Sequence, residues 1–220
     1  MKLKYIALAA ALLLAPVGGA SADWVLGPSL SAGEEDSAFT TEALDRDTLH
    51  LKMPVYHGDN LLARARINGA IETRVSSFEK SLAERNGTWK TEGWISWQEG
   101  MAGKDSPYTS FLLITSTYPD RAAHPTSYAW PMTFDGLGHR VTVRDLAKKM
   151  ASLTVEEVNR QIEIQCRNRQ IPIFEDHHTV RKLPDTFYIG KDGHLYLVFQ
   201  QYEIAPYSSG FIAIDMGTVG

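Results

Sequence analysis

Residues 60–86, NLLARARINGAIETRVSSFEKSLAERN, predict the longest helix of this chain of 220 residues. Asp59 or Asn60 can cap its first turn, and Asn86-Gly87 supplies a left-handed residue that can end it. Charged side chains occupy the side opposite the apolar ones. The apolar side chains recur at spacings of three and four, as on one face of a helix: Ile67, Ile71, Val75, Phe78 and Leu82.

On either side of this helix the sequence changes to strand patterns and short helices. Residues 47–56 alternate with period two, and Pro54 suggests that this strand ends at a sheet edge or a bend. Residues 88–98 and 108–118 are rich in aromatic and β-branched side chains and should form neighbouring antiparallel strands. Further elements are a strand at 127–134, helices at 143–150 and after Thr154, a hairpin of 186–189 with 194–199, and a last strand at 211–216.

These elements do not follow the regular strand-helix alternation of a parallel sheet. We therefore predict the α+β class, with a mainly antiparallel sheet, one long helix and two shorter ones. We expect two sub-lobes, residues 47–105 and residues 106–217. Residues 23–46 mix Gly, Pro, Ser and acidic residues without periodicity and predict a linker or N-terminal arm.

The first 22 residues have the features of a secretory signal. Lys2 and Lys4 precede an apolar stretch, residues 5–17, that runs into Ala20-Ser21-Ala22. Cleavage after Ala22 would leave 198 residues with 20 basic and 26 acidic side chains, so the net charge would change from −4 to −6. We expect an exported protein, periplasmic or secreted, with no membrane insertion after cleavage.

The composition and the motif search exclude several classes of function. An acidic chain without Lys/Arg-rich runs does not suit nucleic acid or anionic lipid as a partner. No HExxH, CxxC, GxSxG, P-loop or GxGxxG motif occurs, so we predict neither a cofactor nor a metal site. His177-His178 is more simply a pair of loop histidines than a metal site, and Cys166 a buried apolar residue.

Aromatic side chains gather in two parts of the sequence. Trp94 and Trp97, in one predicted strand, should lie on opposite faces. Such tryptophans could stack on sugar rings if exposed, but sheet core is the commoner explanation. Near the C-terminus, the turn at Pro206 is surrounded by Tyr202, Glu203 and Tyr207. The tyrosines could be half-buried, with their hydroxyls bonded to loop backbone, while Glu203 accepts hydrogen bonds from exposed amides or pairs with a cation of a partner.

The segment Tyr202-Glu203-Ile204-Ala205-Pro206-Tyr207, with the hairpin before it, resembles the closing hairpin of the RsiV-like family. Ala123-His124-Pro125 and residues 137–146 (LGHRVTVRDL) resemble further parts of that family. Many members have a glycine-rich GGAH segment where this chain has Arg121-Ala122-Ala123-His124. The family includes the extracellular domain of the anti-sigma-V factor, which binds lysozyme, and the non-catalytic N-terminal part of the deacetylase PdaC.

The resemblance implies a two-lobed α+β fold outside the membrane. Because none of the catalytic motifs above occurs, we expect this domain to bind and not to catalyse. We expect it to recognise a lysozyme-type protein or peptidoglycan, with Tyr202, Glu203, Pro206, Tyr207 and His124 as the candidate binding residues. One alternative is a cell-wall hydrolase that uses Glu203 as acid or base together with a distant acid or a histidine. Another is a structural envelope protein that associates with itself.

Overall fold

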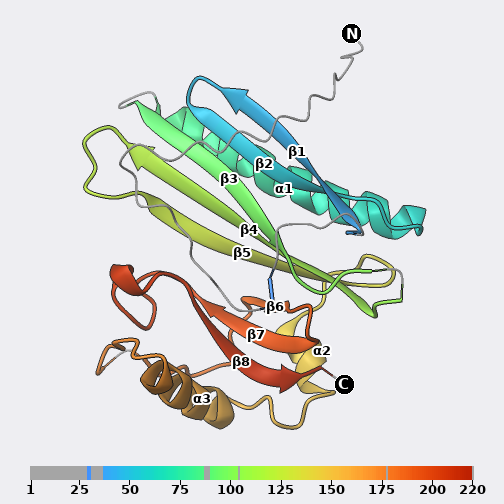
Figure 1. Ribbon diagram of the computed structural model, residues 1–220, viewed down its shortest axis with the longest axis vertical. Coiled ribbons are helices and arrows are strands. Elements are labelled where there is room, and N and C mark those ends of the chain that lie inside the picture. The colour runs from blue at the N-terminus through green and yellow to red at the C-terminus, as the bar shows by residue number, and fades with distance from the viewer. Residues whose placement is uncertain (1–28, 31–36, 87–89, 104, 177, 220) are drawn as a thin grey trace.

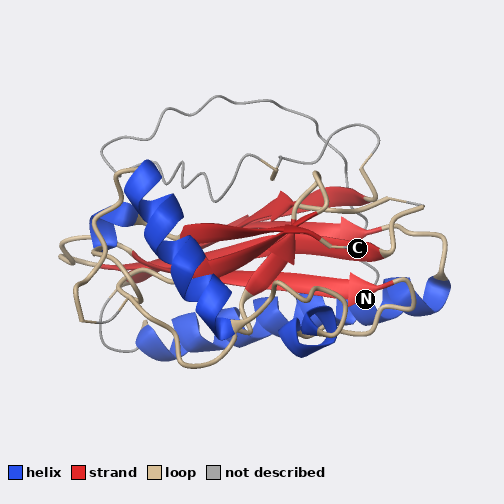
Figure 2. Cartoon of the chain, turned by 90° about the horizontal axis from the view of Figure 1, so that it is seen from below, coloured by secondary structure: helices blue, strands red, loops and turns tan. Residues whose placement is uncertain are grey.

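Two sheets face each other in the middle of the molecule, and helices cover their outer faces. The computed structural model describes residues 29–30, 37–86, 90–103, 105–176 and 178–219, and the predicted signal lies outside them. Figure 1 shows the larger sheet with α1 in the upper half and the smaller sheet with α2 and α3 in the lower half, and Figure 2 gives the view from below. The α+β class predicted from the sequence is confirmed.

The larger sheet has the strand order β1-β2-β3-β4-β5. Neighbouring strands are antiparallel except β2 and β3, whose parallel connection runs through α1. A parallel pair needs such a crossover, because a tight turn can only reverse the chain. The elements of this half are β1 (Phe39–Arg46), β2 (Leu49–Tyr56), α1 (Leu61–Arg85), β3 (Thr91–Glu99), β4 (Tyr108–Pro119) and β5 (Thr126–Asp135).

The smaller sheet has the order β6-β7-β8 and is antiparallel throughout. Its elements are α2 (Val143–Ala147), α3 (Val155–Asn168), β6 (Phe187–Ile189), β7 (His194–Phe199), the short 3-10 helix η1 (Tyr207–Ser209) and β8 (Ile212–Thr218). Within the described residues, no helix is both long and apolar enough to span a membrane.

The long helix forms as its sequence predicts. The Asn60 side chain accepts hydrogen bonds from the backbone N–H groups of Leu62 and Ala63, at 3.0 and 3.1 Å, and so caps the first turn. The backbone N–H of Asn86 bonds Leu82 O at the other end. Gly87 lies outside the described residues. The predicted apolar stripe packs on the larger sheet, with Phe78 only partly buried.

The linker prediction is wrong for residues 39–46. These residues form β1, which pairs with β2 along its whole length, from Phe39 opposite Tyr56 to Arg46 opposite Leu49. The Phe39 ring is buried, with its centroid 5.4 Å from that of Trp97. Apart from Ala43, the exposed positions of this edge strand carry polar or charged side chains, so its sequence looks like a linker although the buried Phe39 ring packs in the core.

The predicted boundary between sub-lobes, at 105/106, is also wrong. β4 and β5 pair with each other, and β4 pairs with β3, so both belong to the larger sheet. The change from one sheet to the other falls between Asp135 and Val143. Pro54 lies within β2 and not on an edge strand, but the ladder to β3 stops at Leu51, so β2 has one strand partner there.

The side chains of β4 show how the two halves join. Phe111 and Leu113 point to the α1 side, whereas Leu112 and Ile114 pack against residues of the smaller sheet. On that sheet Tyr188, Tyr196 and Val198 face β4 and β5, while alternate residues face α2 and α3. Because strand side chains alternate between faces, a strand covered on both sides becomes an almost continuous buried run.

Candidate functional site

Two loops that are far apart in the sequence meet at one end of the β4–β5 hairpin. The first joins β4 to β5 and carries His124; the second joins β7 to β8 and carries Tyr202, Glu203, Pro206 and Tyr207. The Tyr207 hydroxyl donates a hydrogen bond of 3.0 Å to Pro125 O, which is 82 residues away in the chain. The structure thus brings the candidate binding residues of the sequence to one place.

The rings of this place form one cluster, which we call the aromatic surface: His124, Tyr202 and Tyr207. His124 stacks on Tyr207 with ring centroids 3.9 Å apart and an interplanar angle of 28°. The centroids of Tyr202 and Tyr207 are 5.8 Å apart. Tyr207 is half-buried, as expected, whereas Tyr202 is 59% exposed and differs from that expectation.

Backbone and side-chain bonds hold the second loop rigidly. The Glu203 carboxylate accepts the backbone N–H of Gln200 at 2.7 Å, and its own backbone N–H returns a bond to Gln200 O. Ile204 and Ala205 are buried between these exposed residues and anchor the loop in the core of the smaller half. The backbone N–H of Phe174 bonds Ile204 O at 2.9 Å.

Tyr202 has a backbone φ of 65°, in the left-handed region. For a bulky side chain this conformation costs about 1–3 kcal/mol and persists only where the surroundings enforce it. Gly210, which closes the loop, has a φ of 68°, which glycine adopts without strain because it has no Cβ atom. The loop therefore stores strain at Tyr202, whose ring is one of the exposed rings of the aromatic surface.

Gln200 is a residue of this site that sequence reasoning missed. Its side-chain amide bonds both backbone groups of Ala129, accepting from the N–H at 2.9 Å and donating to the carbonyl at 2.8 Å. This pair of bonds fastens the start of the second loop to β5. No local pattern could have revealed it, because the partner lies 71 residues earlier in the chain.

The chemistry of Glu203 is that of a structural acceptor. Among the described residues, no hydrogen bond or ion pair joins its carboxylate to a second acid or to a histidine. His178 contacts Phe174 O at 2.6 Å through Nδ1, while His177 lies outside the described residues. In the part of the chain that the structure describes, no group of three or more His, Cys, Asp or Glu could hold a metal ion.

The two tryptophans of β3 have different surroundings. Trp97 is buried against Phe39 and donates its indole N–H to Thr41 Oγ1 at 3.0 Å. Trp94, on the opposite face of β3, is half-buried and stacks on His50 with ring centroids 5.6 Å apart. Core packing, the commoner explanation, thus holds for Trp97.

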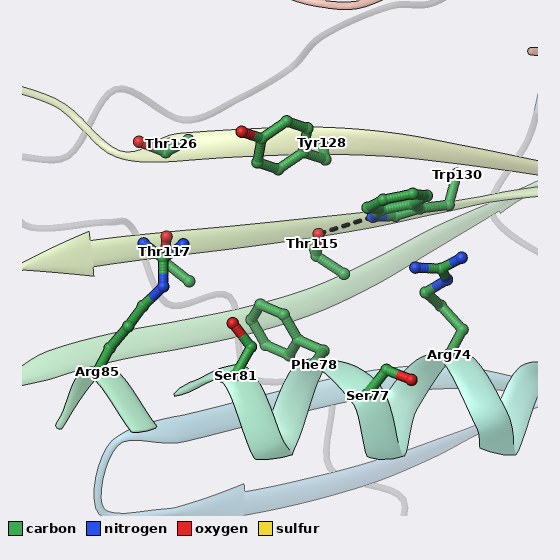
Figure 3. A pocket seen from close by; sticks show the side chains of 10 residues that line it. All are labelled: Arg74, Ser77, Phe78, Ser81, Arg85, Thr115, Thr117, Thr126, Tyr128 and Trp130. Carbon is green, nitrogen blue, oxygen red and sulfur yellow. Dashed lines mark hydrogen bonds between the residues drawn. The ribbon is translucent and has the colours of Figure 1, made fainter. Parts of the chain in front are cut away.

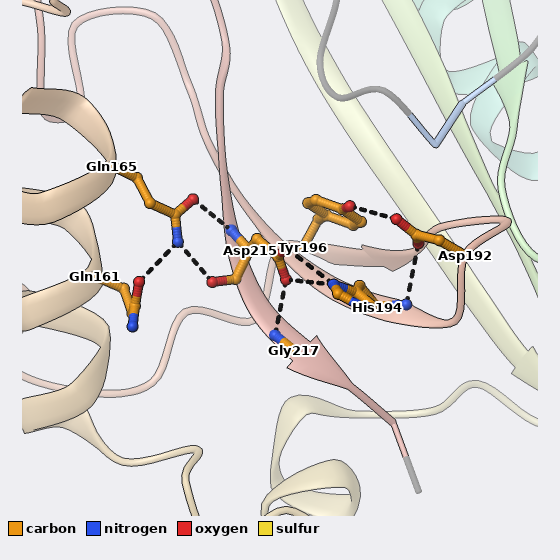
Figure 4. A network of polar contacts seen from close by, with 7 residues as sticks. All are labelled: Gln161, Gln165, Asp192, His194, Tyr196, Asp215 and Gly217. Atoms are coloured by element: carbon orange, nitrogen blue, oxygen red, sulfur yellow. Dashed lines mark hydrogen bonds and ion pairs between the residues drawn. The ribbon is translucent and has the colours of Figure 1, made fainter. Parts of the chain in front are cut away.

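Away from the aromatic surface, a cluster of polar side chains joins β7 and β8 to α3 (Figure 4). His194 Nδ1 lies 2.9 Å from Asp215 Oδ2, and this bond is the main cause that raises the pKa of the imidazole. The Gln165 side chain bonds both backbone groups of Asp215, at 2.7 and 3.0 Å. Tyr196 donates its hydroxyl to Asp192 at 2.7 Å. These groups bond one another and so hold the hairpin in place.

Comparisons with known proteins agree with this architecture. A DUF3298 domain, described as a protein of unknown function, is found in residues 143–217. This range runs from α2 to β8, so it includes Tyr202 to Tyr207 but not His124. Among curated proteins, a search finds no match to the chain.

Two solved structures resemble the chain over both halves. The crystal structure of a DUF3298 family member from Bacteroides fragilis NCTC 9343 aligns with a TM-score of 0.51 and 15% identity, covering 84% of this chain and 92% of that one. A DUF3298 family protein from Pseudomonas aeruginosa PAO1 aligns with a TM-score of 0.51 and 12% identity, covering 83% and 92%. At such low identity the likeness shows a shared fold. That fold extends well beyond residues 143–217.

Proposed function

We propose that this protein is a non-enzymatic, exported binding domain that recognises a basic, lysozyme-type protein at the cell envelope. The observation that carries the proposal is the aromatic surface, in which Tyr202 projects from a rigid, strained loop beside Glu203. Aromatic rings presented on rigid loops are typical hot spots of protein interfaces. The RsiV-like resemblance of the Tyr202–Tyr207 segment, which lies inside the DUF3298 domain, supports the same interpretation.

Charge favours a cationic partner. The chain carries a formal net charge of −4, and removal of the predicted signal would make it −6. Glu203 adds an exposed acid next to the exposed ring of Tyr202. Opposite net charges accelerate the encounter of two proteins, and a partner's cation could then bond the free side of this carboxylate.

The test is retention of the purified chain on immobilised lysozyme at low ionic strength, followed by affinity measurements on variants. We expect Tyr202→Ala to weaken binding by about tenfold or more, as for a hot-spot ring. Glu203→Gln keeps an acceptor for the Gln200 N–H and removes only the charge, so it should reduce mainly the association rate. Added salt should reduce the difference between this variant and wild type.

Leu137→Ala is a matched control, because Leu137 is a large apolar residue that is 53% exposed. It follows the far end of β5, about 30 Å from Pro125 at the near end. Binding of lysozyme should survive this change. Absence of binding by the wild-type chain would refute the proposal, and retention on purified peptidoglycan alone would favour a glycan partner instead.

The hydrolase alternative can be tested with the same purified protein. If the chain clears cell-wall suspensions and Glu203→Gln abolishes the clearing with the fold intact, the protein is an enzyme and the proposal is wrong. Light scattering at several concentrations distinguishes the remaining alternative, self-association.

A further inference from the structure

A groove of about 210 Å³ lies between α1 and the strands β4 and β5 (Figure 3). Thr117 and Thr126, at one end of it, flank the β4–β5 loop that carries His124 of the aromatic surface, but the groove itself lies on the α1 face of the sheet. It exists because small side chains oppose each other there. Ser77 and Ser81 on the helix face Thr115 and Thr117 on β4, where larger apolar residues would close the gap. Sequence reasoning did not find this groove, because its walls come from three separate elements.

The charged residues of the groove are all cationic. Arg74 and Arg85 line it, and none of its described lining residues is acidic. Neither arginine forms an ion pair with any residue that the structure describes, and the buried Nε of Arg74 has no hydrogen-bond partner there. Burial lowers the pKa of the Arg74 guanidinium. Burial also lowers the pKa of Arg140, and repulsion by the nearby Arg74 lowers it further. The groove is therefore a positively charged site on a protein whose net charge is negative.

Arg74 stacks on one of the rings that line the groove. Its guanidinium lies over the Trp130 ring, 3.8 Å from the centroid, so one face of the group is covered by the indole. The Trp130 indole N–H donates to Thr115 Oγ1 at 2.9 Å, which leaves the proton of the threonine hydroxyl for another acceptor. Arg74 is half-buried, and a partly desolvated cation without an anion costs free energy that a bound oxyanion would recover.

Rings and hydroxyls form the remaining walls. Phe78 lies on the helix side, and Tyr128, 48% exposed, lies on the strand side with its ring centroid 5.9 Å from that of Trp130. Arg74 and Arg85 stand at opposite ends of the groove (Figure 3). The volume is below the roughly 300–1,000 Å³ of sites for drug-sized ligands, so the groove suits a ligand of about one ring.

We propose that this groove is a binding site for an acidic sugar, with the carboxylate at Arg74 and the ring between Phe78 and Tyr128. A guanidinium forms strong hydrogen bonds to a carboxylate, aromatic rings pack on the apolar face of a sugar, and the serine and threonine hydroxyls match its hydroxyl groups. Arg85 adds positive charge at the other end of the groove. This site is separate from the aromatic surface and does not depend on the function proposed for it.

The test uses glucuronate as the probe, with glucose and acetate as matched compounds that lack the carboxylate or the ring. Titration of the purified full-length chain is followed by NMR, and the indole N–H signal of Trp130 serves as the local reporter. We expect glucuronate to shift this signal at lower concentration than either control compound. Equal effects of acetate and glucuronate would show a plain anion site and overturn the proposal, as would absence of any shift with glucuronate.

Variants locate the site. Arg74→Gln and Arg85→Gln should each weaken glucuronate binding, the first by about tenfold, as for loss of a charge-assisted hydrogen bond. Arg85 is exposed, so its variant should keep the fold even if Arg74→Gln does not. Arg64→Gln, on the same helix outside the groove, should bind like wild type. An equal loss in Arg64→Gln would refute the site, and lysozyme binding should be unchanged in all three variants.

Discussion

Gly100, the residue after β3, lies where the larger sheet meets β6 of the smaller one, and its replacement by alanine tests how the two sheets join. Its backbone N–H bonds Ser110 O at 3.0 Å, and the next residue, Met101, donates to Ile189 O at 2.8 Å. A Cβ atom at Gly100 would lie 2.3 Å from Ile189 O and 3.1 Å from Ser110 O. Both neighbours are backbone atoms, with Ile189 in β6 of the smaller sheet and Ser110 in β4 of the larger one. The contact with Ile189 O can therefore be relieved only if the two sheets move apart.

The size of the effect follows from this geometry. A carbon and an oxygen in contact need about 3.3 Å, so β6 would have to shift by about 1 Å. Such overpacking costs about 1–3 kcal/mol, and weakening the bond from Met101 to Ile189 adds about 1 kcal/mol. We therefore expect Gly100→Ala to lower the free energy of unfolding by about 2–4 kcal/mol and Tm by about 5–15 °C.

Thermal and urea unfolding monitored by circular dichroism measure the change. Gly69→Ala is the matched control, because a Cβ atom at this position inside α1 would meet nothing within 4 Å. The same substitution should there stabilise the protein by about 0.5–1 kcal/mol, since glycine loses more backbone entropy on folding. If Gly100→Ala unfolds within a degree of wild type, the close contact between the sheets is not as the structure describes it.

Three further predictions concern other parts of the molecule. Phe39→Ala should destabilise the protein by about 3–5 kcal/mol in urea unfolding, because the ring is buried, whereas no effect would mean that residues 39–46 are a linker after all. The bond to Asp215 raises the pKa of His194 in the folded state above its unfolded value of about 6.5. The bond therefore stabilises the protein fully below the unfolded pKa, and this contribution is lost as pH rises through the folded pKa. His194→Gln should therefore cost more stability at pH 5 than at pH 9, and an equal cost at both would contradict this. Cys166 is fully buried and burial raises its thiol pKa, so a thiol reagent should modify it only in denaturant; rapid modification of the native chain would contradict the packing of α3.

Local sequence determined most of the individual elements. The capping side chains Asn60, Thr142 and Thr154 mark helix starts, and each accepts a backbone N–H as expected. The hairpin around residues 190–193 also follows from its sequence, with Gly193 at φ of 78°. These features depend on neighbours within a few residues, so the sequence contains the whole interaction.

Only the tertiary structure decided which strands share a sheet. β1 has an exposed, polar pattern, and one buried ring on the core side suffices to hold it, so its residues resemble a linker. The run of buried residues in β4 predicts a strand, but this pattern does not indicate that the two faces of the strand contact different halves of the molecule. Sheet membership depends on partners distant in sequence, which local periodicity does not specify.

The same reason separates the two sites. The Tyr202–Tyr207 segment could be chosen from the sequence because its aromatic, acidic and turn residues are adjacent. That His124 stacks on Tyr207, and that Gln200 fastens the loop to β5, came from contacts over more than 70 residues. The groove left no local signal, because Arg74 is an ordinary helix-surface residue until β5 places Trp130 beside it. Residue chemistry is fixed by the sequence, but its combination into a site is fixed by the packing of distant elements.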